Sequence, residues 1–134
     1  MSARHLRNGR DGENEAREYL EGQGLIVLET NWRHRKGELD LVCSEDEYIV
    51  FVEVKTRAKG SKELPGEALT WNKRRRLARA ASAYLTVKKL WQRPCRFDLV
   101  AVTLDGQSRK VEHYPDVFEF PQTMGGSHSS WQPW

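Results

Sequence analysis

The chain has 134 residues, enough for about one domain with a core that folds without disulfides or a structural metal. It contains 22 Lys and Arg residues and 19 Asp and Glu residues, and the resulting net charge of +3 does not by itself indicate a nucleic-acid-binding protein. Two cysteines without metal-ligand spacing argue against a zinc site and a disulfide framework, and no apolar run is long enough to span a membrane. The first residues lack the apolar centre of a signal peptide, so we expect no membrane association and a cytoplasmic location.

The chain begins with a polar, basic segment, residues 1–12, which we interpret as a flexible arm. The pattern from Glu13 to about Gly22 predicts a helix with Ala16 and Leu20 on its buried face. At about 100° per residue, Glu13 is the one acid of this helix that is angled toward the core.

Three strands are expected next. Residues 25–32 begin with a continuous apolar run, residues 38–43 alternate in polarity, and residues 49–55 are rich in β-branched and aromatic side chains. The polar residues between the second and third strands predict a hairpin. Residues 58–66 contain glycines, a proline and alternating charges, which predict a surface loop.

A long helix is predicted over residues 70–87, capped by the threonine that begins it. Residues 97–104 predict a strand and residues 110–114 a short edge strand, with an Asp-Gly turn signal between them. Residues 121–134 are rich in Gly, Ser, Gln and Pro, and we expect a flexible tail that contains tryptophan. The order α-β-β-β-α-β-β predicts one α/β domain over residues 13–120, with a mixed central sheet flanked by helices.

Charged side chains interrupt the second and third strands, which are otherwise apolar. Burying unpaired charges is costly, and a divalent cation would compensate them. If the hairpin is centred in its polar turn, Asp40 lies opposite Glu53, and Glu38 lies opposite Lys55. Directly paired side chains have Cβ atoms about 4.5–5.5 Å apart, so the two carboxylates could share one Mg²⁺ or Mn²⁺ ion.

Lys55 is expected on the same face of its strand as Glu53, where an ammonium could orient or deprotonate a metal-bound water. The alternative interpretation is that these residues are solvated charges on the open face of a hairpin. Glu38 and Lys55 would then form an ordinary surface ion pair.

Acids and bases are segregated along the chain. Nine basic residues and no acid occur from Trp71 to Arg96, whereas six acids and no base occur from Glu38 to Glu53. Four bases lie in the first turns of the second predicted helix, where the macrodipole disfavours cations, so a phosphate backbone is the better explanation. They are Lys73, Arg74, Arg75 and Arg76. Arg57 would add to this contact; a solvated helix face is the alternative, and Trp71 either stacks on an unpaired base or is buried against the sheet.

The motifs together resemble one known family. In chain order they are Gly12-Glu13, Gly37-Glu38-Leu39-Asp40-Leu41-Val42, Phe51-Val52-Glu53-Val54-Lys55-Thr56-Arg57 and Arg96-Phe97-Asp98. Over roughly residues 9–120 the chain is similar to the YraN family, a group of small bacterial proteins with sequence similarity to archaeal Holliday-junction resolvases. The resemblance implies a restriction-endonuclease-like fold and a nuclease core of the PD-(D/E)xK type.

In that pattern Asp40 and Glu53 would be metal ligands, Lys55 would position the attacking water, and Glu13 would be an additional metal-site acid. We therefore expect a Mg²⁺-dependent (or Mn²⁺-dependent) nuclease that acts on phosphodiester bonds, with branched or single-stranded DNA favoured over RNA. One alternative is a nucleic-acid-binding protein that retains the fold without turnover, and another is an interaction protein whose tail docks a partner. A domain of this size has one active site, so paired incisions would require a homodimer.

Overall fold

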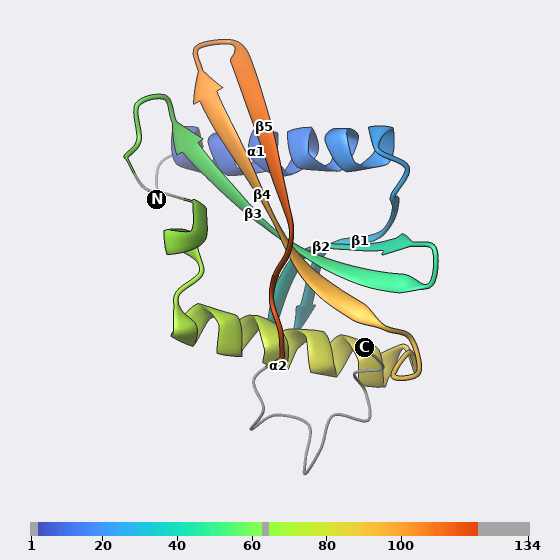
Figure 1. Ribbon diagram of the computed structural model, residues 1–134. Helices are drawn as coiled ribbons and strands as arrows, with labels where there is room; N and C mark the ends of the chain where they lie inside the picture. Colours follow the sequence, from blue (N-terminus) through green and yellow to red (C-terminus); the bar gives the residue numbers. More distant parts are fainter. Residues whose placement is uncertain (1–2, 63–64, 121–134) are drawn as a thin grey trace.

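The computed structural model describes residues 3–62 and 65–120, which form two helices and a five-stranded sheet (Figure 1). The elements are α1 (Ala3–Gly22), β1 (Ile26–His34), β2 (Gly37–Glu45), β3 (Tyr48–Ala58), the 3-10 turn η1 (Pro65–Ala68), α2 (Trp71–Val87), β4 (Cys95–Asp105) and β5 (Ser108–Phe118). The predicted α/β class and the order α-β-β-β-α-β-β are confirmed. No helix in the described part of the chain is both long enough and apolar enough to cross a bilayer.

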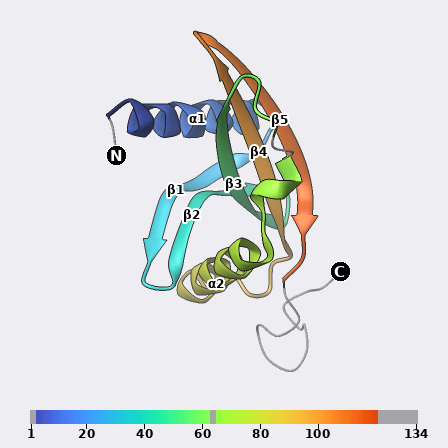
Figure 2. The same ribbon diagram turned by 90° about the vertical axis from the view of Figure 1, so that its left-hand side faces the viewer.

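The strands lie in the sheet in the order in which they occur in the chain. All neighbours are antiparallel except β3 and β4, which are parallel because the α2 crossover returns the chain to the same end of the sheet. The two connections on either side of β3 differ in length. The β2–β3 hairpin turn is tight, whereas the β3–β4 connection brings a whole helix beside β2 and β3 (Figure 2).

The two helices cover opposite faces of the sheet, and each face has its own core. Alternation along β3 sends Val50 and Val52 into the core beneath α1 and Phe51 into the core beneath α2. Strand β2 is less regular, because Leu39 packs into the α2 core while Leu41, two residues later, packs into the α1 core. The alternation of side chains between the two faces of the sheet is therefore interrupted at Asp40, the residue between them.

Helix α1 begins ten residues earlier than the sequence predicts, so the interpretation of residues 3–12 as an arm is wrong. The reason is a tertiary contact near the middle of the helix. Gly12 packs so closely on β3 that a Cβ atom added there would lie 1.9 Å from Oγ1 of Thr56. Contact with the sheet thus supports a helix that local propensity does not predict. The predicted tail, residues 121–134, lies outside the described residues.

Candidate active site

Two carboxyl groups, those of Asp40 and Glu53, lie where the ladder between β2 and β3 ends. The predicted hairpin register is confirmed, but the last ladder pair is Leu41 with Val52. Beyond that pair the Oδ2 atom of Asp40 accepts a hydrogen bond of 2.9 Å from the backbone N–H of Val54. The carboxylate of Asp40 therefore takes the place of a backbone acceptor and is held against β3.

The expected pairing of Glu38 with Lys55 is wrong. Glu38 lies opposite Arg33 of β1, and Lys55 lies opposite Ala101 of β4. The physical reason is the change of face at Asp40, which separates β2 from β3 before the ladder reaches these positions. Lys55 does not line the cleft described below.

Burial dominates the chemistry of Glu53. Its side chain is only 13% exposed, and this desolvation raises its pKa to about 8. The neighbouring Asp40 adds to the rise through its charge and a hydrogen bond, whereas Lys73 opposes it, with its Nζ atom 3.5 Å from Oε1 of Glu53. Burial and the neighbouring carboxyl group of Asp40 thus both favour the protonated form of Glu53 relative to an exposed glutamate.

Glu13 is a neighbour of this pair. Desolvation raises the pKa of Glu13, a hydrogen bond to Asn31 lowers it, and the charge of Asp40 raises it further. Among the described residues no group of three or more His, Cys, Asp or Glu side chains is arranged to hold a metal ion. Asp40 and Glu53 thus form a two-carboxyl site, and Glu13 lies close enough to Asp40 to influence it electrostatically.

The carboxyl pair opens into a cleft of about 510 Å³ between the β1–β2 turn and α2. The charged residues that line it are Arg35, Lys36, Glu38, Asp40, Glu53, Lys73, Arg76 and Arg79. Lys73 pairs with Glu53, but no carboxylate in the part of the chain whose side chains are described pairs with Arg35, Lys36, Arg76 or Arg79. The five cations that line the cleft outnumber its three carboxyl groups, so the cleft has an excess of positive charge.

The structure divides the predicted basic cluster of α2. Lys73 and Arg76 line the cleft, whereas the Nε–H of Arg74 donates to the carbonyl of Leu69 at 2.8 Å, away from it. The guanidinium of Arg75 lies 4.8 Å from the ring centroid of Trp71. Trp71 is 63% exposed, so the alternative prediction that its ring is buried against the sheet is wrong.

Three cleft cations were not predicted to be site residues: Arg35, Lys36 and Arg79. The signal for the first two was the run of bases in the β1–β2 turn, but its position depends on long-range packing. Gly37, in the left-handed region with φ of 145°, brings the turn so close to α2 that an added Cβ would lie 3.0 Å from Cβ of Ala80. This contact places the turn opposite the cationic side of the helix.

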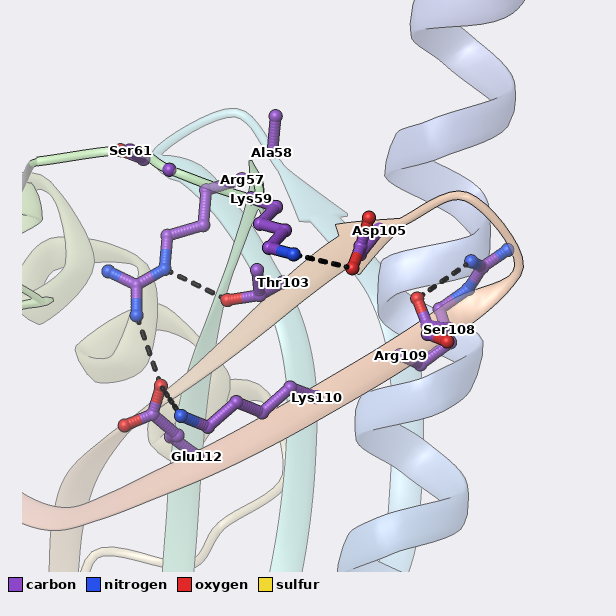
Figure 3. Close-up of a pocket in the computed structure, with 11 residues that line it drawn as sticks. Arg57, Ala58, Lys59, Ser61, Thr103, Asp105, Ser108, Arg109, Lys110 and Glu112 are labelled. Atoms are coloured by element: carbon purple, nitrogen blue, oxygen red, sulfur yellow. Dashed lines mark hydrogen bonds and ion pairs between the residues drawn. The ribbon is translucent and has the colours of Figure 1, made fainter.

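A second pocket, of about 360 Å³, lies at the far end of β3, β4 and β5 and contains Arg57 (Figure 3). Its charges compensate one another: Arg57 Nη2 lies 3.1 Å from Oε1 of Glu112, and Lys59 Nζ lies 3.3 Å from Oδ2 of Asp105. Lys110 also approaches Glu112, at 4.0 Å. The predicted phosphate contact of Arg57 is therefore separate from the cleft, and its charge already has a protein partner.

Fold and cleft together define a small α/β protein with a paired-carboxyl site between cationic walls. Residues 12–102 match the family described as "Uncharacterised protein family UPF0102". A UPF0102 protein of Nitratidesulfovibrio vulgaris (strain DP4) is 48% identical over 134 residues, which cover 100% of this chain and 99% of the relative. A UPF0102 protein of Lawsonia intracellularis is 43% identical over 94% of this chain and 96% of its own, and one of Rhodococcus opacus is 40% identical over 87% and 99%.

The chain belongs to the UPF0102 family. This membership agrees with the predicted resemblance to YraN proteins at the level of the family. The matched region contains both carboxyl groups of the site and the cationic first half of α2.

Proposed function

We propose that the protein is a Mg²⁺-dependent nuclease of the restriction-endonuclease-like, PD-(D/E)xK type that hydrolyses phosphodiester bonds in DNA. The observation that carries the proposal is the adjacent pair Asp40 and Glu53 in a cleft whose other charges are mainly unpaired cations. Proteins bind Mg²⁺ through one or two carboxylates together with water and substrate phosphates. The donor set of two carboxyl groups without His or Cys fits such a hard cation, Mg²⁺ or Mn²⁺.

Each residue of the site has a role in this proposal. Asp40 and Glu53 would hold the cation, which when bound would stabilise negative charge on the phosphate and acidify a water molecule. The Val54 N–H fixes the orientation of Asp40, and Lys73 favours the ionised form of Glu53. Lys55, about 7 Å along β3 from Glu53, would orient or deprotonate the attacking water.

Glu13 would act as an outer acid beside Asp40, whose charge raises the pKa of Glu13. The unpaired cations would bind the phosphates that flank the scissile bond, with the β1–β2 turn on one side and α2 on the other. The described part of the chain contains one such carboxyl pair, so paired incisions in a branched DNA would need a homodimer.

The alternative is a protein that binds nucleic acid in the same cleft without hydrolysis. It is supported by the same unpaired cations, which suit phosphate whether or not a metal is bound. Sequence-independent binding of this kind would persist in a chelating buffer, and cleavage would not.

The test is cleavage of single-stranded, duplex, flapped and four-way-junction DNA, each with Mg²⁺, Mn²⁺ or a chelator. Asp40→Asn and Glu53→Gln should abolish cleavage, whereas Asp105→Asn, at the far end of the sheet, should not. Cleavage by the first two variants at the wild-type rate, or no cleavage by the wild type of any substrate, would refute the nuclease. In the second case, DNA binding in chelator that weakens in Arg76→Ala would support the binding protein.

A further inference from the structure

Trp71 is the most exposed aromatic side chain of the described part of the chain, although it lies in the first turn of a packed helix. A tryptophan is rarely left in solvent without a partner, because burying its ring is strongly favourable. One side of the indole is occupied by Arg75, whose guanidinium carbon lies 4.8 Å from the ring centroid. The exposure of 63% leaves the rest of the ring open to a ligand.

Trp71 is connected to the cleft by a band of cations around α2. At about 100° per residue, Arg76 lies about 60° around the helix from Lys73, and Arg79 lies about 60° further. In the same direction around the helix, Arg75 lies about 40° beyond Arg79, and Trp71 lies about 40° beyond Arg75. A chain of phosphates that leaves the cleft past Arg76 and Arg79 would therefore reach the open indole ring over the exposed side of the helix.

The charges around the ring favour one kind of ligand. Arg75, Arg76 and Arg79, on this side of α2, form no ion pair with a carboxylate whose side chain is described, so a negatively charged partner suits this surface. It must also present a flat, apolar face to the indole. A nucleic acid strand with unpaired bases combines both properties, because every base has a π face that stacks on aromatic rings. The bases of an intact duplex are stacked on each other and are not available in this way.

We propose that Trp71, backed by Arg75, stacks on an unpaired base of a single-stranded segment whose phosphates extend from the cleft along α2. The inference rests on the proposed function in that it takes nucleic acid as the ligand, and it names single-stranded segments as the preferred class. It does not depend on hydrolysis. The base platform and the carboxyl pair are separate groups on separate elements.

The experiment is fluorescence anisotropy with a labelled single-stranded oligonucleotide and with a blunt duplex of equal length, both in chelator so that no cleavage occurs. Trp71→Ala should weaken binding of the single strand about 5- to 150-fold, the range expected for loss of one stacked base, and should leave duplex binding nearly unchanged. Trp71→Phe should restore most of the loss. Val87→Ala, an exposed apolar residue at the other end of α2, is the matched control and should have no effect. Circular dichroism melting would establish that every variant is folded.

Each outcome has a separate meaning. Single-strand affinity that is unchanged in Trp71→Ala, or lost equally for the duplex, would overturn the base platform and leave the nuclease proposal standing. Selective loss of single-strand binding in a protein that cuts no substrate would support the platform and refute catalysis. Failure of the wild type to bind either nucleic acid in chelator would overturn the platform, and an apolar protein partner would then be the better explanation of the exposed ring. The cleavage assay with Mg²⁺ would still decide the nuclease.

Discussion

Replacing Glu53 by glutamine should change how the stability of the protein depends on pH. The folded-state pKa of Glu53 is about 8, whereas its ordinary value is 4.5, so the folded protein binds the proton more tightly than the unfolded chain. Stability therefore falls as the pH rises between these two values. From the two pKa values, ionisation of Glu53 beside Asp40 reduces the free energy of unfolding by roughly 3–4 kcal/mol between about pH 5 and about pH 8. Glu53→Gln, which stays neutral, removes this loss.

The assay is chemical unfolding of wild type and variant across this pH range without divalent metal. The difference in unfolding free energy should grow with pH in favour of Glu53→Gln. Glu112→Gln is the control: a hydrogen bond from Tyr114 lowers the pKa of Glu112 below its ordinary value, so its carboxylate is ionised in both the folded and the unfolded chain across this range, and the difference between this variant and wild type should not change with pH. Curves for wild type and Glu53→Gln that stay parallel would refute the reasoning, because Glu53 would then titrate as it does in the unfolded chain.

Two further predictions concern the scaffold. Asp98→Ala should destabilise the protein by about 3–5 kcal/mol in chemical unfolding. The reason is that the buried carboxylate accepts hydrogen bonds from Arg96, His113 and the Asp116 backbone. A loss below about 1 kcal/mol, as expected for an exposed ion pair, would contradict this prediction. Gly12→Ala should cost about 1–3 kcal/mol, because its Cβ would clash with the β3 side chain described above. The control for this variant is Gly22→Ala, which has open space around it, and equal stability of the two variants would show that α1 can shift without cost.

The register of the β2–β3 hairpin could be predicted because turn residues and alternation act over a few residues. The end of the ladder at Asp40 could not, because it depends on β1. Asn31 there has a left-handed φ of 50°, and its side chain donates a hydrogen bond to the carboxylate of Glu13. The β1–β2 ladder also shifts register between Val27 and Glu29. These features belong to a strand whose own pattern shows only an apolar run. The sequence therefore predicts that Asp40 and Glu53 lie close together, but it does not predict that the β2–β3 ladder ends before it reaches them.

The second wall of the cleft was also beyond prediction, for a different reason. Arg35 and Lys36 are a basic turn in the sequence, and such turns are usually solvated. Their relation to Arg76 and Arg79 depends on the docking of Gly37 against α2, a contact between residues 43 positions apart in the chain. For Arg57 the prediction failed in the opposite direction. Its charge was predicted to bind a phosphate, but it pairs with a carboxylate 55 residues away in the chain. Composition gives the number of charges, and only the fold determines which of them are paired.

The distribution of paired and unpaired charges bears on how the cleft would select its ligand. A divalent cation alone would be repelled by the four unpaired cations and would have to compete with a proton for the carboxyl group of Glu53. A phosphate alone would be attracted by those cations but would approach the carboxylate of Asp40. Each ligand would therefore relieve the repulsion that opposes the other, which is positive coupling between two binding equilibria. Under the proposed function, this arrangement would favour occupation of the metal site when a nucleic acid phosphate is present, so that assembly of the active site would depend on the substrate itself.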